Sequence, residues 1–346
     1  MRTKTTLMLL LVIVYIAIRT VSSGFYTHLR SPYCGFAEAF KIIDIEFGTP
    51  AEEVIEHLVR EGILPGRRGF QLLLFLSPPS RFIKAGEYKF DLSLSPLRVY
   101  QKLIMGEVFY HPLTIPEGKD LWDIAELVEK EGFCARSDFL KAVHRSDLVR
   151  QWDHQADDLE GYLYPDTYML TKGAKPPTVV EMMVKRFQEV FDEELREECV
   201  RMGFSVREIV TLSSMIEKET SIPEEKPIIS AVFLNRLHRG MLLQCDPTLI
   251  YALKMASLYQ GNIRRRDFEF DSPYNTYRYE GLPPGPIANP GRESLMAALH
   301  PADSDYLYFV SKNNGEHHFS RSLREHQQAV VRYQKKYPRT AKRGGK

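Results

Sequence analysis

The hydrophobic pattern along the chain is most regular in one stretch, residues 206–220. Apolar or small residues recur there at i, i+3, i+4 and i+7, the spacing of one face of an α-helix. The pattern predicts a helix whose core-facing stripe consists of Ile209, Leu212, Ser213, Ile216 and Thr220. Projection at 3.6 residues per turn places Lys218 opposite this stripe, in water. Glu217 and Glu219 then fall on the two shoulders of the helix.

The shoulder position makes Glu217 a candidate general acid. We expect its carboxylate to lie among apolar and small side chains of its own helix, below Val206, Val210 and Ser213. Partial desolvation favours the protonated form of a carboxyl group, which a general acid needs at neutral pH. The alternative is an ordinary helix with two surface glutamates, and the pattern alone does not decide between the two.

The N-terminus carries a targeting pattern. Arg2 and Lys4 precede an uncharged apolar run over residues 7–18, which Arg19 closes. A basic flank before such a run keeps the N-terminus cytoplasmic and sends the following chain across the membrane. The run is short for a span of ~20 residues and suits a signal-peptide core of about 7–15 residues. Residues 1–23 therefore predict either a cleaved signal or an uncleaved anchor, and both place the body of the chain outside the cytoplasm.

An internal repeat follows a linker over residues 24–40. The segment from Ile45 to Gly62 matches the segment from Ile115 to Gly132 at one constant offset. Each copy predicts a strand, a glycine turn and an amphipathic helix that ends at a glycine. A second helix and a glycine-bearing strand follow each copy, the strands at residues 85–90 and 160–164.

Two small α+β units in tandem are therefore expected over residues 41–170. A strand–turn–helix unit of this kind resembles the LysM-type glycan-binding modules. The alternative is that the repeats are spacers with no ligand.

The remaining chain predicts a mixed helical domain over residues 178–338. Its helices are expected at residues 179–202, 206–220, 228–237, 294–300 and 322–337. Rigid loops rich in proline and glycine separate them between Gly240 and Gly291. Residues 306–320 predict a β-hairpin around an Asn-Asn-Gly turn. Residues 339–346 form a basic tail. The predicted fold class is therefore α+β, with an N-terminal membrane segment.

The proline-rich loops offer aromatic, amide and hydroxyl side chains. Sugar polymers present apolar faces and polar rims, so such a mixture suits a glycan ligand. The candidates are Gln244, Asp246, Thr248, Tyr274, Asn275 and Tyr277. We expect the loops at residues 274–277 and 281–287 to wall a cleft over Glu217, with Asn275 bonding an N-acetyl group. The alternative is a structural cap.

Composition excludes several function classes. The net charge of +1 argues against nucleic acid, whose phosphates require a basic face. The four cysteines are far apart and show no zinc spacing. Nucleotide-binding and metalloprotease motifs are absent from the sequence, so no cofactor is expected. A metal hydrolase using His317, His318 and His326 is disfavoured, because adjacent residues of a strand point to opposite faces.

Six short motifs, in one order, give the chain a specific resemblance. They are residues 216–220, 233–237, 244–248, 274–277, 281–287 and 317–320. Together they resemble the endolytic murein transglycosylases of bacteria, the MltG or YceG-like family, over about residues 43–333. The resemblance implies a protein with one N-terminal anchor in the bacterial cytoplasmic (inner) membrane, a LysM-like region and a catalytic domain.

The resemblance also implies a reaction on peptidoglycan. Family members cleave the N-acetylmuramic acid-β-1,4-N-acetylglucosamine bond within glycan strands, leave 1,6-anhydro ends and are expected to terminate strand elongation. The implied partners are glycan strands and, less specifically, peptidoglycan synthases and division proteins. The implied acid is Glu217, the first glutamate of the Glu-Lys-Glu-Thr motif. The other matching positions are Gln244, Asp246, Asn275, Tyr277 and His317.

The chain departs from the family at Cys245 and Asn289, and the first puts a thiol near the expected site. Two alternatives stay open. One is a non-catalytic, membrane-anchored peptidoglycan-binding scaffold. The other is a muramidase that uses water, with Asp246 as the second carboxylate that such an enzyme needs.

Overall fold

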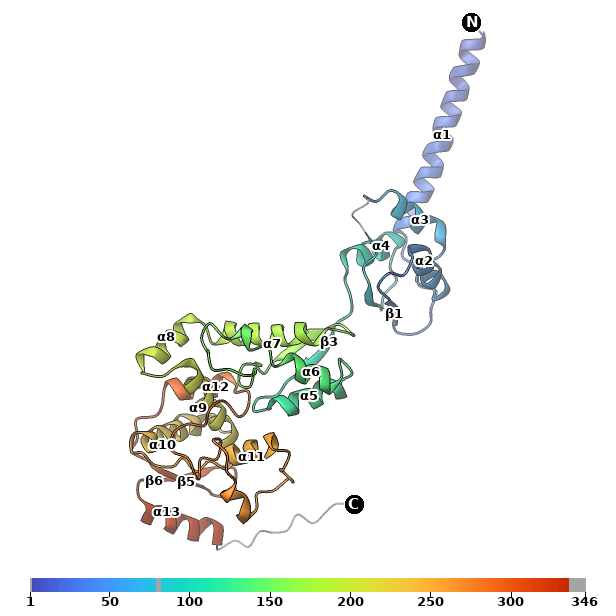
Figure 1. Cartoon of the computed structure of the whole chain (residues 1–346). Helices are drawn as coiled ribbons and strands as arrows, with labels where there is room; N and C mark the ends of the chain where they lie inside the picture. The colour runs from blue at the N-terminus through green and yellow to red at the C-terminus, as the bar shows by residue number, and fades with distance from the viewer. Residues whose placement is uncertain (1, 79–81, 336–346) are drawn as a thin grey trace. The chain divides into compact units, whose positions relative to one another are not determined.

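The computed structural model describes residues 2–78 and 82–335 (Figure 1). Within these residues, helices predominate and each of the three sheets is a single pair of strands. The mixed α+β class expected from the sequence is confirmed. The described chain forms two compact units, residues 2–111 with 169–172, and residues 112–168 with 173–335. The predicted basic tail lies outside the described residues.

The first unit is a two-stranded sheet covered by short helices. Its elements are α1 (Arg2–Arg30), β1 (Lys41–Ile45), α2 (Ala51–Arg60), α3 (Arg67–Phe75), β2 (Gly86–Phe90) and α4 (Pro96–Met105). The strands β1 and β2 are antiparallel, with Lys41 opposite Phe90. Their inner faces pack with the helices into one core that includes Leu58, Phe70 and Tyr88.

The helix α1 covers the segment for which we predicted a membrane span. Among the residues that the structure describes, no helix combines the length and the apolar character that crossing a membrane requires. The expected span over residues 1–23 is therefore not supported by the described structure.

The second unit carries most of the predicted motifs. It begins with β3 (His111–Thr114), α5 (Leu121–Lys130), α6 (Arg136–Ala142), η1 (Ser146–Leu148) and β4 (Thr167–Leu170). The first residue of β3 and the last two of β4 are counted with the first unit. Its central helices are α7 (Pro176–Val190), α8 (Glu193–Arg201), α9 (Val206–Glu219), η2 (Pro223–Glu225), α10 (Lys226–His238) and α11 (Asp246–Met255). It ends with η3 (Arg265–Glu269), α12 (Arg292–Leu299), β5 (Tyr308–Ser311), β6 (His317–Ser320), α13 (Leu323–Val330) and η4 (Val331–Lys335). β3 pairs with β4, and β5 pairs with β6.

The helix α9 forms where the hydrophobic period predicted it. Ser205 caps its N-terminus in a reciprocal capping box with Glu208, which satisfies two free backbone N–H groups. All five residues of the predicted stripe are buried. α10 and α12 both pack against α9, and Figure 1 shows the three helices together in the second unit.

Several other predicted elements are changed or confirmed. The predicted helix over residues 179–202 is two helices, because the Asp192 side chain caps a new helix, α8. The β-hairpin is confirmed, with Tyr308 opposite Ser320. The helix α11 was missed, since its first turn was interpreted as loop.

The second copy of the repeat differs from the prediction. The strand expected at residues 85–90 is β2, but residues 160–164 form a turn, and the strand of the second copy begins at Thr167. Gly161 has a φ of +86°, and a β-carbon there would lie 2.6 Å from Pro286. A left-handed φ of this kind is not that of an extended strand, and the close approach to Pro286 leaves no room for a side chain at this position. The likeness to LysM modules is not confirmed.

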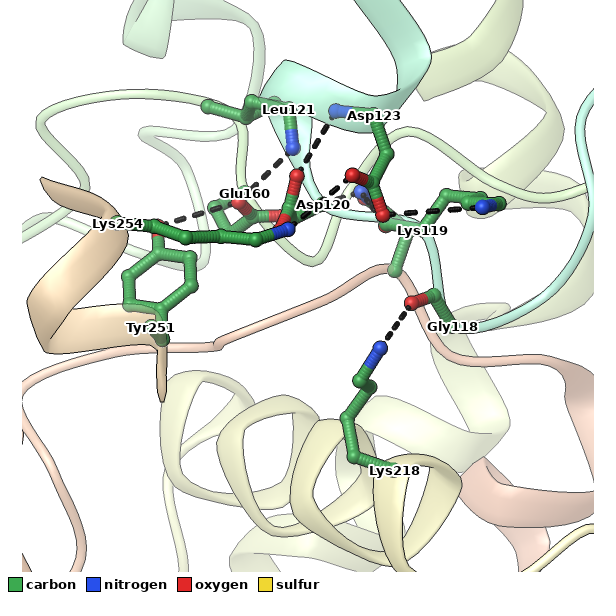
Figure 2. A network of polar contacts seen from close by, with 10 residues as sticks. Gly118, Lys119, Asp120, Leu121, Asp123, Glu160, Lys218, Tyr251 and Lys254 are labelled. Carbon is green, nitrogen blue, oxygen red and sulfur yellow. Dashed lines mark hydrogen bonds and ion pairs between the residues drawn. The ribbon is translucent and has the colours of Figure 1, made fainter. Parts of the chain in front are cut away.

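A buried polar network ties the second copy to the helices of the second unit (Figure 2). The carboxylate of Glu160 accepts hydrogen bonds from the Leu121 backbone N–H at 3.1 Å and from the Tyr251 hydroxyl at 3.1 Å. Burial raises the pKa of Glu160 well above its ordinary value. The Lys218 ammonium donates to the Gly118 carbonyl at 2.9 Å. As predicted, Lys218 is exposed, but its ammonium group is hydrogen-bonded to the second copy of the repeat.

Asn289 closes this network from the loop that precedes α12. Its side chain donates to the Lys119 carbonyl at 2.9 Å and to Glu160 at 3.0 Å, and it accepts from the Leu163 N–H at 2.8 Å. Its side chain is fully buried. One amide therefore joins three segments that are distant in sequence.

We predict that Asn289→Ala lowers the free energy of unfolding by roughly 2–3 kcal/mol, because it leaves buried partners unpaired. Denaturant unfolding followed by circular dichroism measures this loss. Asn262→Ala is the control, because Asn262 is exposed. Equal stabilities of the two variants would contradict the role of Asn289.

Candidate active site

The end of α9 carries two glutamates whose carboxylates meet different surroundings. The carboxylate of Glu217 accepts hydrogen bonds from the Ser294 hydroxyl at 2.6 Å and from the Gly291 N–H at 3.0 Å. The Lys226 ammonium lies 3.4 Å away, and the Glu217 side chain is only 7% exposed. The expected apolar surroundings of Glu217 are therefore wrong. The loop before α12 and the start of α10 bring it hydrogen-bond donors and a positive charge.

Glu117, from the second repeat, joins the same cluster. Its carboxylate lies so close to Gly291 that a β-carbon there would be 1.8 Å from Oε1, so any larger residue at position 291 would displace the Glu117 carboxylate. Burial raises the pKa of Glu117, and the negative charge of Glu217 adds to this effect. The sequence analysis did not find Glu117, although it occupies the repeat motif Ile115–Gly118.

Glu219 borders a cavity of about 350 Å³. The cavity is lined by Glu219, Arg236, Leu243, Gln244, Asp246, Tyr277, Phe309, Val310 and His326. Burial raises the pKa of Glu219, while a hydrogen bond from Cys245 acts in the opposite direction. The desolvated carboxylic acid that we expected at Glu217 is therefore found two residues further along the helix.

Three predicted ligand-binding residues meet at this cavity. Gln244, Asp246 and Tyr277 all line it, and the Tyr277 hydroxyl donates to the Asp246 carboxylate. Asp246 and Gln244 are exposed, so their remaining hydrogen-bonding capacity is open to a ligand. Gln244 lies just before α11, Asp246 is its first residue, and Tyr277 comes from the loop at residues 272–279.

His317 lies behind the cavity wall. Its ring Nδ1 is 2.7 Å from the Glu225 carboxylate, and its backbone N–H donates to the same group at 2.7 Å. The ring also packs edge-on against Phe309, a wall residue, at 5.5 Å between centroids. His317 therefore packs against the wall residue Phe309 but does not itself line the cavity.

Asn275 and Thr248 are structural in this fold. Asn275 is fully buried, its amide donates to the carbonyls of Phe268 and Phe270, and its oxygen accepts from the Tyr277 N–H. The buried Thr248 hydroxyl donates to the Cys245 carbonyl at 2.7 Å. Neither side chain has a free group for a sugar, so the expected bond from Asn275 to an N-acetyl group does not fit the structure.

The loop at residues 281–287 does not form the predicted wall over Glu217. Residues 281–284 border a different cavity, of about 710 Å³, together with Trp152 and Arg207. The Ile287 N–H donates to the buried Ser214 hydroxyl at 3.0 Å, which fixes the loop to α9. Tyr274 packs against Tyr251 at 5.1 Å between ring centroids. This loop is therefore mainly scaffold.

Several residues of the cavity were not among the predicted ligand-binding residues. Arg236 is buried, and its guanidinium donates to the carbonyls of Leu307 and Leu243, each at 2.7 Å. Its place in the motif at residues 233–237 was the available signal. His326 also lines the cavity, and burial lowers its pKa. Within the described residues, no group of three or more histidine, cysteine or acidic side chains is placed to hold a metal ion.

Comparison with known proteins agrees with the predicted family. The sequence pattern of the YceG-like family matches residues 43–332. The endolytic murein transglycosylase of Bacillus subtilis is 32% identical over 309 residues, which cover 84% of this chain and 84% of that protein. The endolytic murein transglycosylase of Streptococcus pneumoniae is 28% identical over 291 residues, which cover 72% of this chain and 51% of that protein.

A crystal structure of a YceG-like protein from Listeria monocytogenes gives the same result. It aligns with a TM-score of 0.58 at 30% identity, covering 85% of this chain and 100% of that chain. The match of the family pattern extends from β1 to η4 and so includes every motif on which the resemblance rested. The chain belongs to the YceG-like family.

Proposed function

We propose that this chain is an endolytic murein transglycosylase that cuts peptidoglycan glycan strands internally. Two of its relatives carry that name. The observation that links the proposal to particular residues is the position of Glu219. This half-buried residue borders a cavity lined by polar and aromatic side chains. Such a group can transfer a proton to a bound glycan, and the neighbouring Tyr277, Asp246 and Gln244 can hold the sugar.

The reaction needs only one carboxyl group. Glu219 would give its proton to the leaving oxygen as the bond from C1 of N-acetylmuramic acid to O4 of N-acetylglucosamine breaks. The C6 hydroxyl of the same muramic acid would then attack C1 and return its proton to Glu219. The bond from C1 to O6 replaces the broken bond, so no water is consumed. The product strand ends in 1,6-anhydro-N-acetylmuramic acid.

We assign the acid to Glu219 rather than to Glu217, the residue implied by the first glutamate of the motif. Lys226, the Gly291 N–H and the Ser294 hydroxyl all contact the Glu217 carboxylate. Glu217 does not line the cavity that Glu219 borders. We propose that Glu217 has a structural role, which is to fix the end of α9 to α10 and α12.

The muramidase alternative uses the same cavity. Asp246 could serve as a second carboxylate, but it already accepts a hydrogen bond from Tyr277. A muramidase would add water and leave reducing ends. A non-catalytic scaffold would leave strands intact.

Product analysis tests the function. We predict that the purified protein converts isolated glycan strands into shorter strands with 1,6-anhydro ends. Mass spectrometry should detect these products as lighter by one water than the reducing-end strands that hydrolysis would give. Reducing ends would support the muramidase, and uncut strands would support the scaffold.

A matched pair of variants tests the assignment of the acid. We predict that Glu219→Gln lowers kcat about 100- to 10,000-fold, because an amide cannot donate the catalytic proton. Glu217→Gln should keep kcat within about tenfold of the wild type while its stability falls by roughly 3 kcal/mol, since Lys226 loses a buried counter-charge. Cleavage rates and unfolding curves of both variants measure this. The opposite pattern would restore Glu217 as the acid.

We also propose that the first unit keeps the enzyme at the outer face of the bacterial cytoplasmic membrane. The basis is the N-terminal sequence pattern, together with α1 side chains such as Leu11, Ile13 and Ile16, which are more than half exposed. Exposed apolar side chains in such a row are costly in water and favourable in lipid. At this location the enzyme would terminate new strands beside peptidoglycan synthases and division proteins. The repeats would orient the glycan in the manner of LysM modules.

Fractionation tests the location. We predict that the full chain stays with membranes after extraction at high pH, and that a chain beginning at residue 31 is released. Release of the full chain would contradict the membrane proposal without affecting the assignment of the active site.

A further inference from the structure

Cys245 lies directly against the proposed acid. Its thiol sulfur is 3.0 Å from Oε1 of Glu219, with the S–H as donor, and its side chain is buried. Burial and the neighbouring negative charge of Glu219 raise the pKa of Cys245 well above its ordinary value. The thiol therefore keeps its proton and can act as a donor. Among the described contacts, this is the one hydrogen bond to the Glu219 carboxylate.

The backbone around Cys245 is held in a fixed position. Its N–H donates to the Thr276 hydroxyl at 3.0 Å, and the Gln244 N–H donates to the Thr276 carbonyl at 3.1 Å. Gln244 has a φ of +53°, a left-handed conformation that is uncommon for a residue other than glycine. Such strain persists only where the surrounding structure enforces it. These contacts fix the backbone from which the Cys245 side chain projects toward Glu219.

We propose that Cys245 is a positioning residue for the reaction. Its S–H holds Oε1 of Glu219, so that Oε2 is the oxygen that carries the catalytic proton toward the cavity. The proposal rests on the proposed function, because it assumes that Glu219 is the acid. It goes beyond that function by assigning a role to Cys245.

Other titratable and charged groups around Glu219 must be considered in any pH measurement. Asp246, Arg236 and His317 act on the Glu219 carboxylate by their charges, and Tyr277 and His326 line the same cavity. Cys245 also acts on Arg236 and Tyr277 by its charge. The pH profile of Cys245→Ala is therefore compared with that of Cys245→Ser, which keeps a hydrogen-bond donor at this position.

The kinetic test compares three variants. Cys245→Ala should lower kcat about tenfold with KM nearly unchanged, which is the effect of losing one hydrogen bond to a reacting group. Removing a donor to the carboxylate raises the pKa of Glu219, so the falling limb of the pH–rate profile should move to higher pH. Cys245→Ser keeps a donor and should restore both quantities to near the wild-type values.

Cys199→Ala is the matched control. Cys199 is another buried cysteine of the second unit, and its thiol donates to the Leu195 carbonyl at 3.3 Å, within α8. Its loss should leave kcat and the pH profile unchanged. An unshifted profile in Cys245→Ala, or no rescue by Cys245→Ser, would overturn the proposal.

An infrared measurement keeps the proposal testable if Cys245→Ala does not fold. The S–H stretching band of Cys245, isolated by subtracting the spectrum of Cys245→Ser, should move in frequency as Glu219 titrates. In Glu219→Gln the band should not respond to pH. A band that is insensitive to pH in the wild type would contradict the hydrogen bond even if Glu219 is the acid. Full activity of Glu219→Gln would instead contradict the proposed function, whatever the band does.

Discussion

Desolvation of the Glu219 carboxylate is the constraint on which the proposed chemistry depends. Glu219 is the last residue of α9. Its side chain and that of Glu217 contact different neighbours. Burial without a cation in hydrogen-bond contact favours the protonated acid at Glu219. The Glu217 carboxylate instead contacts Lys226, the Gly291 N–H and the Ser294 hydroxyl. Two glutamates separated by one residue thus receive different roles from their surroundings.

The rest of the second unit serves to hold this helix end. α10 and α12 pack on α9, and the loop before α12 returns to bond both Glu217 and the network around Glu160. The proline-rich segment at residues 281–287 is fixed to α9 through the Ser214 hydroxyl. Rigid loops of this kind lose little entropy when a ligand binds, because their conformation is already set.

The sequence predicted the elements that depend on residues close to one another in the chain. The helix α9, its buried stripe and the β-hairpin followed from periodicity and turn residues, because these depend on neighbours a few positions away. The surroundings of the two glutamates could not be predicted, since Ser294 and Cys245 approach them from distant segments. Asn275 shows the same limit: its amide suits a sugar, but the fold uses every polar atom of it internally. The family could be recognised from the sequence, because the order of the six motifs can be read along the chain without knowing the fold.

The most direct test of this account is a crystal structure of the Glu219→Gln variant with an uncut glycan strand. The account predicts that the strand occupies the cavity lined by Tyr277 and Asp246. The glycosidic oxygen should lie within hydrogen-bond distance of the amide at position 219. A strand bound with its glycosidic oxygen at Glu217, or bound away from this cavity, would contradict it.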